Sequence, residues 1–127
     1  METKKVVGVG GIFFKTKNPQ QIKDWYVKHL GFNIDPYGGT TFEARSVDNP
    51  KEEANTVWNP FKHDTNYFEP STKEFMVNYR VEDLEKLLEQ LKSEGVEIVG
   101  ELQVFDYGKF AHIMDPEGNK IELWQPM

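Results

Sequence analysis

The amino-acid sequence predicts an α+β fold made of two β-α-β-β-β modules, and three observations support this prediction. The length of 127 residues suits a single domain. Apolar residues alternate in several short runs, as strands with one buried face require, and recur at helical spacing in two others. The whole pattern also occurs twice, because a shift of 65 places Gly11 on Met76 and a shift of 64 places Gly31 on Gly95.

The first half begins with VVGVGGIFFKT, residues 6–16, whose β-branched and aromatic residues predict a strand. Asn18 followed by Pro19 predicts the start of a helix, and Gly31 predicts its end. We expect this helix to pack one apolar stripe against the sheet, formed by Ile22, Trp25, Tyr26 and Leu30. Short strands are expected at residues 32–35, 41–47 and 55–59.

The second half repeats this order. Residues 74–81 alternate as a strand, and Asp83 is placed to cap a helix that ends at Gly95. The apolar stripe of that helix is Leu84, Leu87, Leu88 and Leu91. Strands are expected at residues 96–99, 102–105, 109–114 and 120–125. We therefore predict one domain over residues 1–127, with module one at about 5–61, a connecting segment at 62–72 and module two at about 73–126.

Composition excludes several classes of function. The net charge is −6, and residues 65–127 hold 6 basic against 13 acidic side chains, which disfavours binding to a nucleic-acid backbone. Cysteine is absent, so disulfides and a thiol nucleophile are excluded. No run approaches the ~18 apolar residues of a membrane span. These features favour a cytoplasmic protein with neither nucleic acid nor membrane as a partner.

Three segments resemble the glyoxalase/bleomycin resistance protein/dioxygenase superfamily, also called the vicinal oxygen chelate superfamily. They are NPQQIKDWYVKHLGF (18–32), YRVEDLEKLLEQLKSEGVEI (79–98) and DPEGNKIELWQP (115–126), which hold both predicted helices and several strands of both modules. The resemblance implies a curved mixed sheet around a cleft, a small-molecule ligand and a homodimer. Among possible activities it implies those of a lyase, an isomerase or a dioxygenase.

The resemblance also implies where a metal would be held in metal-dependent members. The four ligand positions of the family fall on Gly11, Trp58, Met76 and Glu122, so one conventional ligand remains. A single carboxylate has too few donors to hold a divalent ion against water. We expect no cofactor. A divalent metal would require Glu122 with unusual partners, for which His112 and His63 are the available side chains.

Strand alternation predicts which side chains face the cleft. The predicted lining is Gly11, Phe13, Lys15, Trp58, Met76, Asn78, Arg80, Phe110, His112, Lys120, Glu122 and Trp124. Pairing across the turn at residues 115–119 places His112 opposite Glu122. Two interpretations of this pair are open: an acid/base dyad for catalysis, or a structural cross-strand ion pair worth about 0.2–1 kcal/mol.

The expected ligand follows from the remaining candidates. Trp58, Phe61, Phe110 and Trp124 indicate an aromatic slot, or else a contact between modules or subunits. Arg80 and Lys15 indicate an anionic ligand, or else are solvated at strand ends. The sequence thus predicts a protein that sequesters or transforms a small aromatic or anionic molecule. The alternative is a divalent-metal-dependent lyase, isomerase or dioxygenase that uses Glu122.

Overall fold

The fold is α+β and contains one curved mixed sheet. A computed structural model describes residues 5–127, and all strands in that range belong to one seven-stranded sheet. The strands are β1 (Val6–Thr16), β2 (Thr40–Phe42), β3 (Thr56–Lys62), β4 (Phe75–Val81), β5 (Ile98–Phe105), β6 (Gly108–Met114) and β7 (Lys120–Pro126). The helices are α1 (Pro19–Leu30) and α2 (Leu84–Ser93). The strand order is β2-β3-β1-β4-β7-β6-β5.

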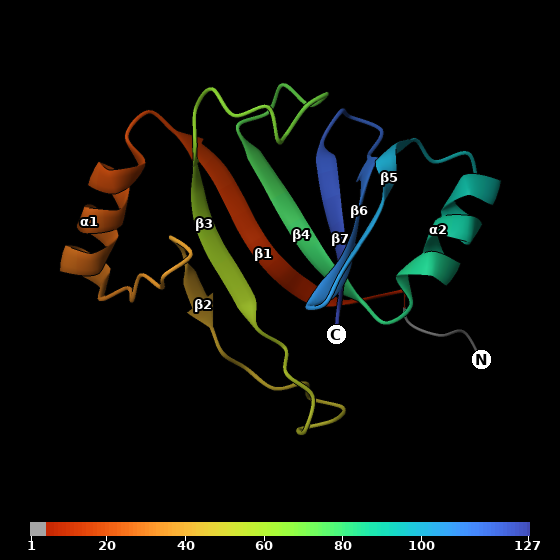
Figure 1. Cartoon of the computed structure of the whole chain (residues 1–127), viewed down its shortest axis with the longest axis horizontal. Helices are drawn as coiled ribbons and strands as arrows, with labels where there is room; N and C mark the ends of the chain where they lie inside the picture. The colour runs from red at the N-terminus through yellow and green to blue at the C-terminus, as the bar shows by residue number, and fades with distance from the viewer. Residues whose placement is uncertain (1–4) are drawn as a thin grey trace.

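The two halves of the chain meet in the middle of the sheet. There β1 and β4 pair antiparallel, with Gly11 opposite Asn78 and Phe13 opposite Met76. The last strand of each half lies parallel to its first strand: β3 beside β1, and β7 beside β4. Figure 1 shows α1 and α2 at opposite ends of the curved sheet. The repeat in the sequence therefore becomes an approximate symmetry about the β1–β4 pair.

The first half has one strand fewer than expected. Residues 32–35 form no strand, and the run expected at 41–47 is reduced to β2 and an isolated bridge between Arg45 and Glu53. Residues 32–35 lead into a tight turn around Asp35, whose side chain accepts hydrogen bonds from the amides of Tyr37 and Gly39. In the second half, the strands expected at 96–99 and 102–105 are one strand, β5, which is irregular around Gly100 (φ 72°).

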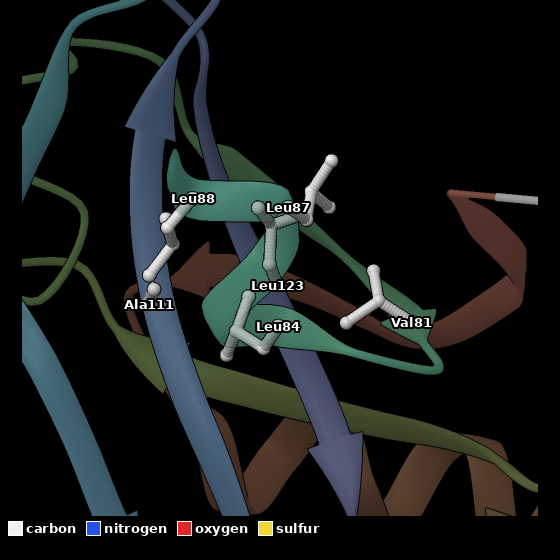
Figure 2. Close-up of a cluster of buried hydrophobic side chains, with 6 residues drawn as sticks. All are labelled: Val81, Leu84, Leu87, Leu88, Ala111 and Leu123. Atoms are coloured by element: carbon white, nitrogen blue, oxygen red, sulfur yellow. The ribbon is translucent and has the colours of Figure 1, made fainter. Parts of the chain in front are cut away.

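The helix α2 packs as its sequence predicts. The Asp83 side chain accepts a hydrogen bond from the amide of Lys86 and caps the helix. Three residues of its apolar stripe are buried in the cluster drawn in Figure 2, which consists of Val81, Leu84, Leu87, Leu88, Ala111 and Leu123, and Leu91 packs against that cluster partly buried. This cluster holds α2 against β6 and β7 and so supports the strands that carry His112 and Glu122.

The helix α1 begins and ends where the sequence predicts, but its stripe is not buried. Gly31 has a left-handed conformation (φ 70°) and ends the helix, yet no residue of α1 is buried and Trp25 is 52% exposed. Contact with the sheet runs through Tyr26, whose ring lies 4.7 Å from that of Trp58. The prediction of a packed stripe is therefore wrong for α1. No helix within residues 5–127 has the length and apolarity needed to cross a bilayer.

Candidate functional site

A cavity of about 240 Å³ opens on the face of the sheet where the two halves meet. Six of the predicted site residues line this cavity: Phe13, Phe61, Asn78, Phe110, Glu122 and Trp124. They come from β1, β3, β4, β6 and β7, so both halves of the chain contribute. Aromatic side chains make up much of the cavity wall. Among the described residues that line the cavity, Glu122 is the only one with a charged side chain.

Glu122 is held by three hydrogen bonds. Asn78 Nδ2 donates to Oε1 at 2.7 Å, and His112 Nε2 lies 2.9 Å from Oε2. The hydroxyl of Tyr67 also donates to Oε2. Asn78 is beside Glu122 in the parallel β4–β7 pair, and His112 is directly opposite it in β6. The predicted register across the 115–119 turn is confirmed, and Glu122 has two further partners besides His112.

These bonds keep the Glu122 carboxylate ionised. Burial alone would raise the pKa of Glu122. The hydrogen bonds from His112, Tyr67 and Asn78 and the charge of His112 together lower it by more, so the net shift of the pKa is downward. The pKa of the Tyr67 hydroxyl is raised by burial and by the adjacent Glu122 charge. Tyr67 therefore remains protonated and donates, while Glu122 accepts.

Tyr67 lies in the segment between the modules and was not among the predicted site residues. The segment is anchored by Phe68, which is fully buried against Phe13 and Met76. It is also held by Lys120, whose Nζ donates to the carbonyl oxygen of Tyr67 at 2.6 Å. The sequence does show an aromatic-rich stretch here, FKHDTNYF. Nothing in that stretch distinguishes the residue that turns inward.

His63 lies in the same segment but does not join the site. It is exposed, and its amide donates to the carbonyl of Thr16 beyond the end of β3. Within residues 5–127 no three His, Cys, Asp or Glu side chains form a group able to hold a metal ion. The set of His63, His112 and Glu122 considered from the sequence is therefore not assembled.

Trp58 was predicted to line the cleft but faces the opposite side of the sheet. It pairs with Ile12 and contacts the ring of Tyr26 beneath α1. The prediction used an offset of 64 residues for the last strand of each half. In the structure Phe13 of β1 lies beside Asn59 of β3, and Asn78 of β4 lies beside Glu122 of β7. Phe13 and Asn78 occupy equivalent positions in the two halves, at an offset of 65. The counterpart of Glu122 is therefore Asn59, which does line the cavity.

Two further predicted ligand-binding residues lie elsewhere. Met76 is fully buried, packs against Phe13 and Phe68, and does not line the cavity. Arg80 lies farther along β4, where its Nη1 donates to the carbonyls of Val9 (2.7 Å) and Asn55 (2.8 Å). It borders a separate hollow lined with acidic side chains. Its guanidinium thus supports the backbone and does not reach the cavity beside Glu122.

Lys15 and Lys120 were also predicted to face the cleft. Lys15 Nζ lies 5.5 Å from the centre of the Phe68 ring, and Lys120 is bonded to the segment that carries Tyr67. Neither lines the cavity. Their positive charges therefore stabilise the connecting segment and offer no direct contact to a molecule in the cavity.

The donor set at the family's ligand positions does not fit a divalent metal. With Asn59 in place of Trp58, the four positions hold Gly11, Asn59, Met76 and Glu122. This gives one carboxylate and one amide, while the thioether is enclosed in an apolar cluster. Hard divalent ions need several oxygen ligands, and softer ions need imidazole or thiolate.

Two buried polar atoms have no hydrogen-bond partner among the described residues: Asn78 Oδ1 and Trp124 Nε1. The orientation of the Asn78 amide follows from its neighbour, because an ionised Glu122 requires the NH₂ group on its side. Oδ1 is thereby directed away from Glu122, near Gly10, at the cavity wall. A buried unpaired acceptor costs about 1–3 kcal/mol, so a donor on a bound molecule is favoured there.

Comparisons with known proteins agree with this architecture. The model of the Glyoxalase/Bleomycin resistance protein/Dioxygenase superfamily matches residues 9–123. A methylmalonyl-CoA epimerase from Mycobacterium tuberculosis is 19% identical, with a TM-score of 0.62 over 100% of this chain and 93% of that chain. A variant of the Streptomyces coelicolor methylmalonyl-CoA epimerase, in complex with 2-nitronate-propionyl-CoA, is 11% identical, with a TM-score of 0.65 over 95% and 98%.

A superfamily member from Vibrio splendidus 12B01 is 15% identical, with a TM-score of 0.59 over 92% of this chain and 97% of that chain. Because the sequence identities are this low, the similarity to these solved structures shows that the fold is shared and nothing more. No curated protein sequence matches the chain significantly.

Proposed function

The chain belongs to the glyoxalase/bleomycin resistance protein/dioxygenase superfamily, and from this premise we propose that it binds a small, uncharged, ring-bearing molecule in the cavity beside Glu122. One observation carries the proposal: the rings of Phe13, Phe61, Phe110 and Trp124 surround a carboxylate that three hydrogen bonds keep ionised. Aromatic walls bind planar apolar surface, and the carboxylate accepts a hydrogen bond that orients it.

The charge of the cavity narrows the ligand class. The sequence left aromatic and anionic ligands open, but the basic side chain expected to bind an anion, Arg80, is bonded to backbone carbonyls elsewhere. An anion would instead meet the negative charge of Glu122 at short range and low dielectric. A cavity of roughly 150 Å³ already accommodates benzene. The cavity beside Glu122, at about 240 Å³, therefore admits one ring with substituents.

Titration with phenol and benzoate tests this proposal. Phenol carries a ring and a hydroxyl donor, and we expect it to shift the NMR signal of the Trp124 indole N–H, whereas benzoate should not. In Glu122→Gln a charged acceptor becomes a neutral one, which lowers the hydrogen-bond contribution by about 1 kcal/mol and phenol affinity about fivefold. Glu117→Gln makes the same change on the exposed turn between β6 and β7 and should have no effect.

The proposal fails if benzoate binds as tightly as phenol, or if Glu122→Gln and Glu117→Gln bind phenol equally well. Thermal melts of both variants show whether each is folded before it is titrated.

A second candidate function is proton transfer at Glu122, favoured because its two carboxylate oxygens have different numbers of hydrogen-bond partners. Oε2 has two partners, His112 and Tyr67, while Oε1 has one, Asn78. The less occupied Oε1 can accept a proton from a bound molecule, with His112 and Tyr67 holding the carboxylate in position. If Glu122 transfers a proton, the protein transforms its ligand. If no proton is transferred, the protein binds and sequesters the ligand.

Hydrogen exchange of phenylacetone in D₂O tests proton transfer. Glu122 would take a proton from the carbon beside the carbonyl, the C–H electron pair would move toward the carbonyl oxygen to give the enolate, and a solvent-derived deuteron would return to that carbon. We expect deuterium incorporation above the buffer rate that Glu122→Gln and His112→Ala each abolish. Incorporation that persists in either folded variant refutes the dyad.

The metal-dependent alternative has its own readout. A lyase, isomerase or dioxygenase that holds its ion through Glu122 predicts stoichiometric metal in protein purified without chelator, and loss of that metal in Glu122→Ala. Relatives named methylmalonyl-CoA epimerases indicate a second probe, because one of them is described in complex with methylmalonyl-CoA. Binding of propionyl-CoA in preference to phenol would favour an acyl-CoA ligand over the proposed one.

The homodimer implied by the resemblance remains a proposal, supported by the large apolar side chains that α1 leaves exposed. Trp25, Val27 and Leu30 are all more than 40% exposed, and a partner subunit would cover part of this apolar area. Light scattering of the purified protein measures the oligomeric state. We expect a dimer whose dissociation is promoted by Trp25→Glu, and a monomer at all concentrations would contradict it.

A further inference from the structure

We propose that the cavity is the inner part of a longer binding site, whose outer part is an aromatic strip that stacks a second ring of the same ligand. The strip consists of Phe105 at the end of β5, Tyr107 in the following turn and Phe110 in β6. The inference rests on the proposed function, because it takes the ring bound beside Glu122 as its starting point.

Strand register places the strip on the cavity side of the sheet. Phe110 lies opposite Trp124, and both line the cavity. Phe105 lies opposite Gly108, two residues before Phe110 in β6. Residues two apart in a strand share a face, and so do residues directly opposite one another. Phe105 therefore faces the same side as Phe110 and Trp124.

The rings form a continuous series from the cavity to the solvent. Trp124 and Phe110 are nearly parallel (3°), with centroids 6.1 Å apart. Phe110 contacts the ring of Tyr107 at 6.0 Å, and Tyr107 stacks on Phe105 at 5.2 Å and 3°. A planar molecule seated on Trp124 therefore meets further aromatic surface as it extends outward.

Gly108 makes this surface possible. A Cβ at this position would lie 2.7 Å from Trp124 Nε1, which is closer than real Cβ atoms approach other atoms. The absence of a side chain lets the indole lie against β6. Trp124 consequently lies parallel to Phe110, the residue that belongs both to the cavity wall and to the strip.

The outer end of the strip is open. Phe105 is 42% exposed and Tyr107 is 66% exposed, whereas Phe110 and Trp124 are half-buried. Because Phe105 and Tyr107 are already stacked on each other, a ligand ring would bind to an ordered pair and little side-chain freedom would be lost. The occupant that fits is the second ring of a molecule whose first ring lies in the cavity, since the two surfaces are continuous.

The inner end specifies the other terminus of the ligand. Asn78 is 2% exposed and its Oδ1 has no partner among residues 5–127, although it lies at the cavity wall. Asn78 Oδ1 and Glu122 Oε1 are both hydrogen-bond acceptors, so a donor on the ligand is favoured beside them. The ligand class is thus an elongated planar molecule with a hydroxyl or N–H donor at its inner end and a second ring at its outer end.

Three probes of graded length test the inference: phenol, 4-phenylphenol and 4-methoxybiphenyl, titrated by calorimetry or by the Trp124 indole signal. We expect 4-phenylphenol to bind more tightly than phenol, and 4-methoxybiphenyl, which has two rings but no donor, to bind more weakly than 4-phenylphenol. Tyr107→Ala should lower the affinity for 4-phenylphenol about tenfold, which is near the low end of the cost of losing one stacked aromatic partner. The affinity for phenol should not change.

Two variants control for other effects. Tyr107→Phe keeps the ring and should retain the affinity for 4-phenylphenol, and Tyr37→Ala removes a tyrosine that is 93% exposed and outside the site. If phenol binds while Tyr107→Ala leaves the affinity for 4-phenylphenol unchanged, or lowers both affinities equally, the strip is not a subsite and the proposed function still stands. If phenol does not bind the wild type at all, the proposed function fails and this inference fails with it.

Discussion

Removing the Tyr67 hydroxyl is the most direct test of the hydrogen bonds around Glu122. Tyr67→Phe deletes one oxygen and keeps the ring, which stacks on Phe61 at 5.7 Å and contacts His112 edge-on at 5.4 Å. The lost interaction is the hydrogen bond to Glu122 Oε2. The change therefore separates a polar contribution from packing.

Its magnitude follows from the charge and exposure of the two groups. A hydrogen bond to a charged group contributes about 1.5–3 kcal/mol to the free energy of unfolding. Tyr67 is 36% exposed, so water can replace part of the lost bond and the low end applies. We expect the free energy of unfolding at pH 7 to fall by about 1.5 kcal/mol.

The pH dependence distinguishes this loss from a packing defect. The folded pKa of Glu122 is lowered, so the stability it contributes is complete above its unfolded pKa, about 4.3, and is lost as the pH falls through the folded value. Once Glu122 is protonated, the Tyr67 hydroxyl no longer donates to a charged acceptor, and its hydrogen bond contributes less to stability. The difference between wild type and Tyr67→Phe should be constant near neutral pH and shrink in acid.

Urea denaturation of wild type, Tyr67→Phe and Tyr37→Phe, from pH 7 to the most acid pH at which all are folded, measures these differences. Tyr37 is 93% exposed, and its variant should match the wild type throughout. A destabilisation by Tyr67→Phe that is the same at every pH, or below about 0.5 kcal/mol at pH 7, would refute the assignment of Tyr67 as a donor to an ionised Glu122.

Three further predictions concern the fold. Leu87→Asp places an unpaired charge in the α2 cluster and should abolish the cooperative melt, whereas Trp25→Asp changes a 52% exposed residue and should leave the protein folded. Gly31→Ala should destabilise by about 1 kcal/mol in urea titrations, because its φ of 70° disfavours a side chain. Asp83→Ala removes the cap of α2 and should also cost about 1 kcal/mol, with no change in phenol affinity.

Local features of the chain were predictable because local geometry sets them. The caps at Asn18 and Asp83 follow from side chains that bond to amides three residues later. The pairing of His112 with Glu122 follows from strand alternation across a short turn, which allows few registers. The expected pair is present for this reason, and its role in catalysis is a proposal.

Two errors have different physical causes. Trp58 was placed in the cleft because one repeat offset was applied to strands that follow loops of different length, and a single residue of error exchanges the two faces of a strand. The stripe of α1 was expected to be buried because periodicity shows that a helix is amphipathic but does not show how close it lies to its sheet.

The sequence by itself determined the α+β class, the repeat, the caps and the strand that carries Glu122, since each depends on the spacing of nearby residues. Only the tertiary structure decided that Asn59 is the counterpart of Glu122, that Tyr67 rather than His63 turns inward, and that Arg80 is bound elsewhere. These outcomes depend on how an irregular segment packs and how far a side chain reaches, which residue spacing does not encode. The candidate site thus owes its position to local patterns and its hydrogen bonds to contacts between residues distant in the sequence.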